Sequence, residues 1–168
     1  MSQLRPFLLL LAAGLLAQLP ARGTDRAEVP YPNGYRHWTF LHSSMVSSTF
    51  GPFKNKPCVS PCTAGIFYFY ANERAMRGLR TGSYPEGAVL AEEMLEFIGT
   101  GGKEGERRIV GVMVKDSRRY AATGGWGYGN YDSGSRTNTL DAKAQDECYQ
   151  CHLKRRDHGY VFSEYRER

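Results

Sequence analysis

The sequence Cys148-Tyr149-Gln150-Cys151-His152, near the C-terminal end, constrains this chain more than any other stretch. Its C-x-x-C-H spacing is the attachment signal of a c-type haem. Two thiols three positions apart in a helical turn can bond to the two vinyl groups of one porphyrin, and the adjacent histidine then reaches the iron. We therefore expect one covalently attached haem c, held by Cys148 and Cys151 and ligated by His152.

A disulfide and half of a zinc site are the alternatives that this pair of cysteines leaves open. A structural zinc ion needs two further ligands at similar spacing, and no such pair lies nearby in the sequence. An export signal at the start of the chain favours the haem interpretation.

Residues 1–23 have the features of a cleaved secretory signal peptide. Arg5 precedes an apolar run over residues 7–19, and the small residues Ala21 and Gly23 come just before Thr24. The run is shorter than the about 20 residues that span a bilayer. We expect a periplasmic or secreted protein with no membrane anchor, whose residues 24–168 form a single domain.

The charge of the chain gives no support for a nucleic-acid partner. The formal net charge is +5, and it falls to +3 without Arg5 and Arg22 of the signal peptide. Two haem propionates would lower it to about +1. The basic residues are scattered among acids, which is typical of a solvated surface. For residues 154–156, directly after the haem motif, an electrostatic rim for an acidic redox partner is the alternative.

Cys58 and Cys62 are the other two cysteines. Thr63 follows Cys62 and the spacing is one residue too long, which excludes a second haem motif. Exported proteins rarely keep two neighbouring thiols free, so we expect a Cys58–Cys62 disulfide that contributes about 2 kcal/mol or less. A redox or metal role for the pair is the alternative.

The remaining sequence predicts an α+β fold, with an antiparallel β-sheet, flanking short helices and a C-terminal haem-attachment helix. Asn72 is the expected N-cap of a helix over residues 73–80, and Asp141 that of the haem helix, which runs through Cys151. Residues 35–42 fit neither the helical nor the strand period. The predicted strands are 66–71, 88–98, 107–115 and 126–131.

Several short motifs, taken in order, resemble the cytochrome P-460 family, which includes the cytochromes c'-beta. They are the run 82–89 (Gly-Ser-Tyr-Pro-Glu-Gly-Ala-Val), the run 112–117 (Val-Met-Val-Lys-Asp-Ser) with Tyr120, Gly125-Trp126, the haem motif, and Val161-Phe162-Ser163 with Tyr165. The likeness extends from about Tyr35 to Tyr165. It implies an antiparallel sheet with flanking helices, a homodimer, and one c-type haem per chain.

The resemblance also implies that His152 is the only protein ligand of the iron. The opposite side of the haem is open in this family to a small molecule such as nitric oxide or hydroxylamine. The side chains that the resemblance places nearest to this distal pocket are Trp38, Phe40, Phe67, Phe69 and Met94. Ordinary core packing on strands is the alternative for each aromatic.

A six-coordinate electron carrier would need a second axial ligand, and no candidate has a spacing that commits it to this role. The candidates are Met45, Met76, Met94, Met113, His37, His42 and His158. For His37 and His42, hydrogen-bonded or half-exposed positions at the edge of a core are the alternative.

One position departs from the hydroxylamine-oxidising members of the family. Those members carry a lysine that is cross-linked to the haem edge, and this chain has Glu92 there. They also use a carboxylate near the start of the next strand, where the sequence 109–112 (Ile-Val-Gly-Val) offers none. A glutamate cannot form the carbon–nitrogen bond, so the chain is more similar to the gas-binding members.

Strand alternation predicts which way Glu92 points. It shares a face with Ala88, Leu90 and Met94, while Glu93 points the other way. If this row faces the haem, desolvation raises the pKa of Glu92, which makes it a candidate proton donor to a bound ligand. A shift in register by one residue is the alternative, with Glu93 inside and Glu92 in solvent.

These observations together predict an exported monohaem c-type cytochrome whose five-coordinate haem binds nitric oxide or a related small nitrogen species. A soluble periplasmic cytochrome would be its redox partner. An enzyme that oxidises hydroxylamine or nitric oxide is the first alternative, and a six-coordinate electron carrier is the second.

Overall fold

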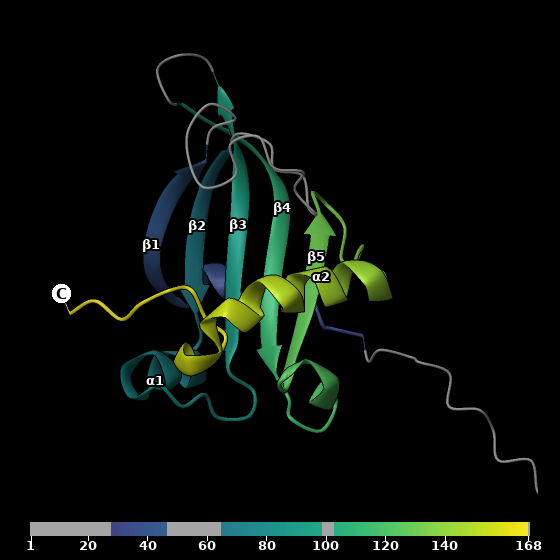
Figure 1. The fold of residues 1–168 in the computed structure, drawn as a ribbon. Helices are drawn as coiled ribbons and strands as arrows, with labels where there is room; N and C mark the ends of the chain where they lie inside the picture. Colours follow the sequence, from purple (N-terminus) through teal and green to yellow (C-terminus); the bar gives the residue numbers. More distant parts are fainter. Residues whose placement is uncertain (1–27, 47–64, 99–102, 168) are drawn as a thin grey trace, which may run out of the picture.

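Five consecutive strands form one antiparallel sheet, in which each strand pairs with the next along the chain (Figure 1). The computed structural model describes residues 28–46, 65–98 and 103–167. The strands are Thr39–Val46 (β1), Gly65–Ala71 (β2), Val89–Ile98 (β3), Lys103–Lys115 (β4) and Trp126–Asp132 (β5). With the short helices, this sheet confirms the predicted α+β fold.

In the described ranges, two α-helices and three 3-10 helices connect and flank the strands. The α-helices are Glu73–Thr81 (α1) and Ala142–His152 (α2), and the 3-10 helices are Tyr35–His37 (η1), Ala121–Thr123 (η2) and Leu153–His158 (η3). Helix α1 begins where the Asn72 side chain accepts a hydrogen bond from the Ala75 N–H, at 2.8 Å. It ends at Gly82, whose φ of 76° favours glycine. Both boundaries agree with the predicted helix.

The sheet has two differently covered faces. Helix α2 crosses one face, which we call the α2 face (Figure 1). There Leu90, Met113 and Tyr128 pack with Cys148 and Tyr149 of the helix. The opposite face is covered by residues 28–38, so we call it the strap face.

The strap is attached to the sheet mainly by tyrosines. Val29 is buried against Tyr131, and the Tyr131 hydroxyl donates to the Val29 carbonyl. Tyr35 of η1 is also buried, and its hydroxyl donates to the Glu93 carboxylate of β3. The strap therefore depends on contacts between residues far apart in the sequence, which local patterns do not reveal.

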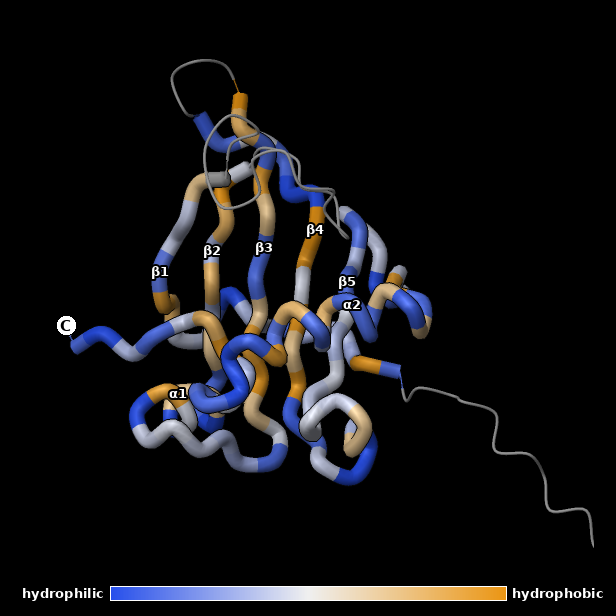
Figure 2. The backbone as a smooth tube through the Cα atoms, in the orientation of Figure 1, coloured by the Kyte–Doolittle hydropathy of each residue, from blue (hydrophilic) through white to orange (hydrophobic). Residues whose placement is uncertain are grey.

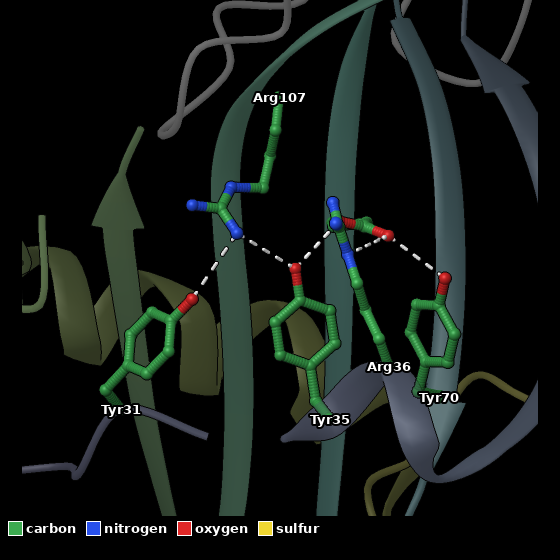
Figure 3. A network of polar contacts seen from close by, with 6 residues as sticks. Tyr31, Tyr35, Arg36, Tyr70 and Arg107 are labelled. Atoms are coloured by element: carbon green, nitrogen blue, oxygen red, sulfur yellow. Dashed lines mark hydrogen bonds and ion pairs between the residues drawn. The ribbon is translucent and has the colours of Figure 1, made fainter. Parts of the chain in front are cut away.

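A buried carboxylate lies at the centre of the strap face. Figure 2 shows a blue, hydrophilic segment midway along β3, the strand that carries Glu92 and Glu93 side by side. Glu93 is 3% exposed, and its carboxylate accepts hydrogen bonds from the Tyr35 hydroxyl at 2.7 Å, the Tyr70 hydroxyl at 3.0 Å and the Arg36 guanidinium at 2.6 Å. In Figure 3 these groups converge on the carboxylate from η1 and β2.

Arg107 joins this network because of a β-bulge. Met94 pairs with Ile109 and Leu95 pairs with Arg107, so Arg108 is an extra residue in β4. The bulge directs Arg107 to the strap face, where its guanidinium donates to the Tyr35 hydroxyl at 3.3 Å and to the Tyr31 hydroxyl at 3.5 Å (Figure 3).

Two of the sequence expectations concern residues outside the described ranges. The signal peptide (residues 1–23) and the Cys58–Cys62 pair lie outside the described residues. In the parts of the chain that the structure describes, no helix has both the length and the apolar composition to cross a bilayer.

Candidate haem site

Helix α2 presents both cysteines of the C-x-x-C-H motif. The helix begins at Asp141, whose side chain accepts a hydrogen bond from the Ala144 N–H at 2.8 Å. Residues three apart lie on the same side of a helix, so Cys148 and Cys151 are neighbours. Cys148 is half-buried against the sheet, and Cys151 is exposed. Both thiols are free, and burial raises the pKa of Cys148 to about 11.

His152, the last residue of α2, is held in one ring orientation. Its Nδ1 donates to the Tyr160 carbonyl at 2.7 Å, since a carbonyl oxygen can only accept. The rings of Tyr128 and Phe162 lie against the imidazole, at centroid distances of 5.1 and 5.0 Å. Burial lowers the pKa of His152, which favours the neutral ring. A neutral ring that donates from Nδ1 has its lone pair on Nε2, where a metal could bind.

The Tyr160 carbonyl reaches His152 through an unusual backbone conformation. Tyr160 has a φ of 69°, a left-handed value that non-glycine residues rarely adopt. Its N–H donates to the Arg155 carbonyl at 2.8 Å, which closes the turn that follows η3. A strained backbone conformation of this kind persists only where the surrounding structure imposes it. The turn therefore fixes the direction of the Tyr160 carbonyl, and with it the hydrogen bond to His152.

The motif, the free Nε2 and the fold agree with one known family. A model of the Cytochrome P460 family matches residues 32–163, which is most of the chain. The chain belongs to the cytochrome P460 family. No curated protein matches it. Family membership implies a haem cofactor.

The side chains around α2 fit such a group. A cytochrome P460 haem needs an iron ligand and apolar cover, and Phe162 lies against His152 while 49% of its surface is exposed. The buried Tyr128 hydroxyl lies beside the same histidine and has no hydrogen-bond partner among the residues that the structure describes. Within the described ranges no three His, Cys, Asp or Glu side chains are grouped to hold a bare metal ion. The donor set therefore fits a haem better than a zinc site.

Glu92 lies on the α2 face of the sheet, as strand alternation predicts for the unshifted register. It pairs with Phe69 of β2 and with Gly111 of β4. A methyl group at Gly111 would come within 2.7 Å of Glu92 Oε1, so the glycine leaves room for the carboxylate. No described residue hydrogen-bonds to the carboxylate, and burial raises the pKa of Glu92 to about 7. Its role as a proton donor stays a prediction.

The structure separates the predicted distal residues into two groups. Phe67, Phe69 and Met94 lie on the α2 face with Glu92, because Phe69 pairs with Glu92 and Phe67 with Met94. Trp38 and Phe40 lie on the strap face, where Trp38 packs in the core and Phe40 contacts the Tyr70 ring. The sheet itself stands between these two residues and α2, so grouping them with the distal pocket needs correction.

A bulge in β1 lies directly after Phe40. Phe40 pairs with Tyr70 and His42 pairs with Phe69, which leaves Leu41 as an extra residue. After the bulge, His42 faces α2: its ring stacks on Phe69 at 4.5 Å, and its Nε2 lies 3.3 Å from Ser163 Oγ. Alternation counted from Phe40 could not reveal this change of face.

Three further residues of the site region were not predicted from the sequence. Glu93 was expected to point away from the haem, but not to be buried among tyrosines and Arg36. Tyr128 and Tyr160 contact His152 from β5 and from the turn after η3. The aromatic-rich run at residues 126–131 was the only sequence signal for Tyr128, and the turn at Gly159 the only one for Tyr160.

Proposed function

We propose that this chain is an exported monohaem c-type cytochrome that binds nitric oxide or a related small nitrogen species. Cys148 and Cys151 would hold the haem through thioether bonds, and His152 Nε2 would ligate the iron. The observation that carries the proposal is the hydrogen bond from His152 Nδ1 to the Tyr160 carbonyl, beside two free thiols on one side of α2. A bound haem would supply an iron atom with a position for a small ligand.

The placement of the other candidate ligands reduces the number that could reach the iron. His37, His158 and Met45 are exposed, and Met45 is 63% exposed at the end of β1. Met76 packs in the core between α1 and the sheet. His42, Met94 and Met113 lie on the α2 face, where His42 contacts Ser163 and Phe69. The ferrous spectrum therefore decides between the gas-binding function and the six-coordinate electron carrier.

The α2 face also suits an uncharged diatomic ligand. Phe67 and Phe69 stack at 6.4 Å, and Met94 is 2% exposed beside them. Bulky apolar side chains exclude water and limit access to larger or charged molecules. A soluble periplasmic cytochrome as redox partner and a homodimer belong to the same proposal, through the family resemblance.

The absorption spectrum of the ferrous protein tests this function directly. Protein exported and matured in cells with a c-type haem maturation system should show a broad, high-spin ferrous spectrum without added ligand. Addition of nitric oxide should convert it to a nitrosyl spectrum with simple saturation. Sharp, split low-spin bands before any addition would reject the proposal in favour of an electron carrier. Turnover of hydroxylamine would favour the enzyme.

Within this proposal Glu92 donates a proton, or a hydrogen bond, to the bound ligand. Its carboxylate is the acidic group of β3 that shares the α2 face with Phe69 and Met94. The titratable groups that face it are Cys148 from α2 and, beyond Phe69, His42 from β1. Cys148 would carry no titrating thiol once it is bonded to the haem, so Glu92 would dominate the pH response.

The change Glu92→Gln should therefore remove a pH dependence near 7. In the wild-type protein we expect the N–O stretching frequency of the nitric oxide complex to change as pH rises through about 7, the pKa to which burial raises Glu92. A raised folded pKa also means that the stability from the neutral carboxyl is complete below the ordinary value of 4.5 and is lost as pH rises through about 7. Both effects should be absent in Glu92→Gln.

Glu96→Gln is the matched control, because Glu96 is on the same strand but pairs with Arg108 at the surface. It should leave the vibrational pH profile unchanged. If Glu92→Gln and wild-type profiles coincide, Glu92 has no role in ligand binding.

Glu92→Lys is a bolder variant, because an amine on this face could form the haem cross-link of the enzymatic relatives and shift the spectrum.

A further inference from the structure

Among the described residues, the hydroxyl group of Tyr128 has no hydrogen-bond partner, although it is buried. Tyr128 is 3% exposed and lies in the middle of β5, beneath α2. A buried hydroxyl without a partner is destabilising, and folded proteins seldom leave one. A phenol keeps its proton at neutral pH, so the group is a donor. Within the described part of the chain this donor therefore has no acceptor.

Comparable tyrosines on the strap face are all satisfied. The Tyr131 hydroxyl donates to the Val29 carbonyl, that of Tyr35 to Glu93, and that of Tyr120 to the Glu28 carbonyl at 3.3 Å. The sheet therefore accommodates buried tyrosines by giving each an acceptor. Tyr128 differs from them in its position, because it faces the helix that carries the haem motif.

The surroundings of Tyr128 are the parts of the site that would touch a haem. Its ring lies 5.1 Å from the His152 ring, at an angle of 45°. The other groups that interact electrostatically with its hydroxyl are Cys148, Tyr149, Tyr160 and Cys151. Cys148 packs from α2 against the same core as Tyr128. None of these groups accepts a hydrogen bond from Tyr128.

We propose that the Tyr128 hydroxyl donates its hydrogen bond to the attached haem, with the Cys148 sulfur as the acceptor, and so positions the haem edge against His152. This inference rests on the proposed c-type attachment. The edge of the porphyrin beside the two cysteines carries only carbon atoms and the thioether sulfurs, and sulfur is a weak acceptor. Attachment fixes the Cys148 side chain, which turns a free thiol into a stationary partner.

A hydrogen bond to this sulfur has a consequence for the iron. It withdraws electron density from the porphyrin edge and so favours the ferrous over the ferric state. Tyr128 also limits rotation of the imidazole, since its ring packs against His152 while the Tyr160 carbonyl holds Nδ1. Tyr128 is thus a positioning residue that acts through the haem edge and His152.

The test compares Tyr128→Phe with Tyr131→Phe in haem-loaded protein. Tyr131 is the matched control because it is a buried tyrosine of the same strand that packs on the strap face. Tyr128→Phe should lower the reduction potential and shift the iron–imidazole stretching frequency, whereas Tyr131→Phe should change neither. A purely structural role for the hydroxyl would leave both quantities unchanged. That result, with a higher melting temperature from loss of the unpaired hydroxyl, would overturn the proposal.

A second substitution keeps the hydroxyl and changes its strength. Replacement of Tyr128 by 3-fluorotyrosine makes the phenol a better donor with little change in size, so the reduction potential should rise above the wild-type value. An unchanged or lower potential contradicts the hydrogen bond, even if Tyr128→Phe fails to fold. Intact mass is measured first on the wild type: an absent haem mass refutes the proposed function itself, before Tyr128 is tested.

Discussion

Serine in place of both Cys148 and Cys151 is expected to abolish covalent haem attachment completely. The two thiols are free and lie on one side of α2, where they would form the thioether bonds. Protein exported from cells with a c-type maturation system should gain the mass of one haem in the wild type and none in the double variant. The measurement is the intact mass of the denatured protein.

Serine in place of both Cys58 and Cys62 is the matched control, since it removes the same number of thiols elsewhere in the chain. It should keep the haem mass. His152→Ala should also keep it, because the thioether bonds remain, but its spectrum should change. A double variant at Cys148 and Cys151 that still carries haem after denaturation would show that attachment uses other residues.

Replacement of Glu93 by alanine should produce the largest loss of stability among single substitutions in the polar network. Its carboxylate accepts hydrogen bonds from Tyr35, Tyr70 and Arg36 (Figure 3). Removal would leave two phenols without an acceptor and would loosen η1 from the sheet. Each phenol left without an acceptor costs about 1–3 kcal/mol. Arg36 stays in contact with water and therefore adds little to this cost. The free energy of unfolding should thus fall by about 3 kcal/mol in total. Denaturant unfolding of haem-loaded protein measures this.

The control for Glu93 is Glu96→Ala on the same strand. Glu96 pairs with Arg108, which is 57% exposed in its side chain, and such surface pairs contribute about 0–1 kcal/mol. Glu96→Ala should therefore change the free energy of unfolding little.

Acid unfolding gives a second measure of the contribution of Glu93 to stability. Burial by itself would raise the pKa of Glu93, but the hydrogen bonds from Arg36, Tyr35 and Tyr70 hold it below the ordinary value of 4.5. Its stabilisation is therefore present above pH 4.5 and is lost as pH falls through the lower folded value, and Glu93→Ala should lose this dependence.

Local patterns were sufficient to predict most of the sheet and both α-helices. The strand over 126–131 and the helix after Asn72 were found within one residue of their observed ends, because capping residues and β-branched or aromatic runs act over short distances. The face of Glu92 followed in the same way from strand alternation. For these elements the information lies in neighbouring residues.

Local patterns did not predict the contacts between residues that are distant in the sequence. The partners of Glu93 in η1 are 57 and 58 positions away, so nothing near Glu93 in the sequence indicates that its charge is buried and paired. The bulges at Leu41 and Arg108 each insert one residue, and one residue is enough to reverse the face of everything beyond it. The family resemblance, which grouped Trp38 and Phe40 with the distal pocket, does not show on which face of the sheet a side chain lies.

The identity of the group that holds His152 has a consequence for how such a protein can evolve. A main-chain carbonyl is present whatever amino acid occupies position 160, so no single exchange of side chain can delete this partner. A side-chain carboxylate in the same place could be altered by one codon change, which would adjust the donor strength of the imidazole. In this chain, a change in the donor strength of His152 requires the turn at Gly159 and Tyr160 to move. The electronic properties of His152 as an iron ligand are therefore linked to the geometry of this turn.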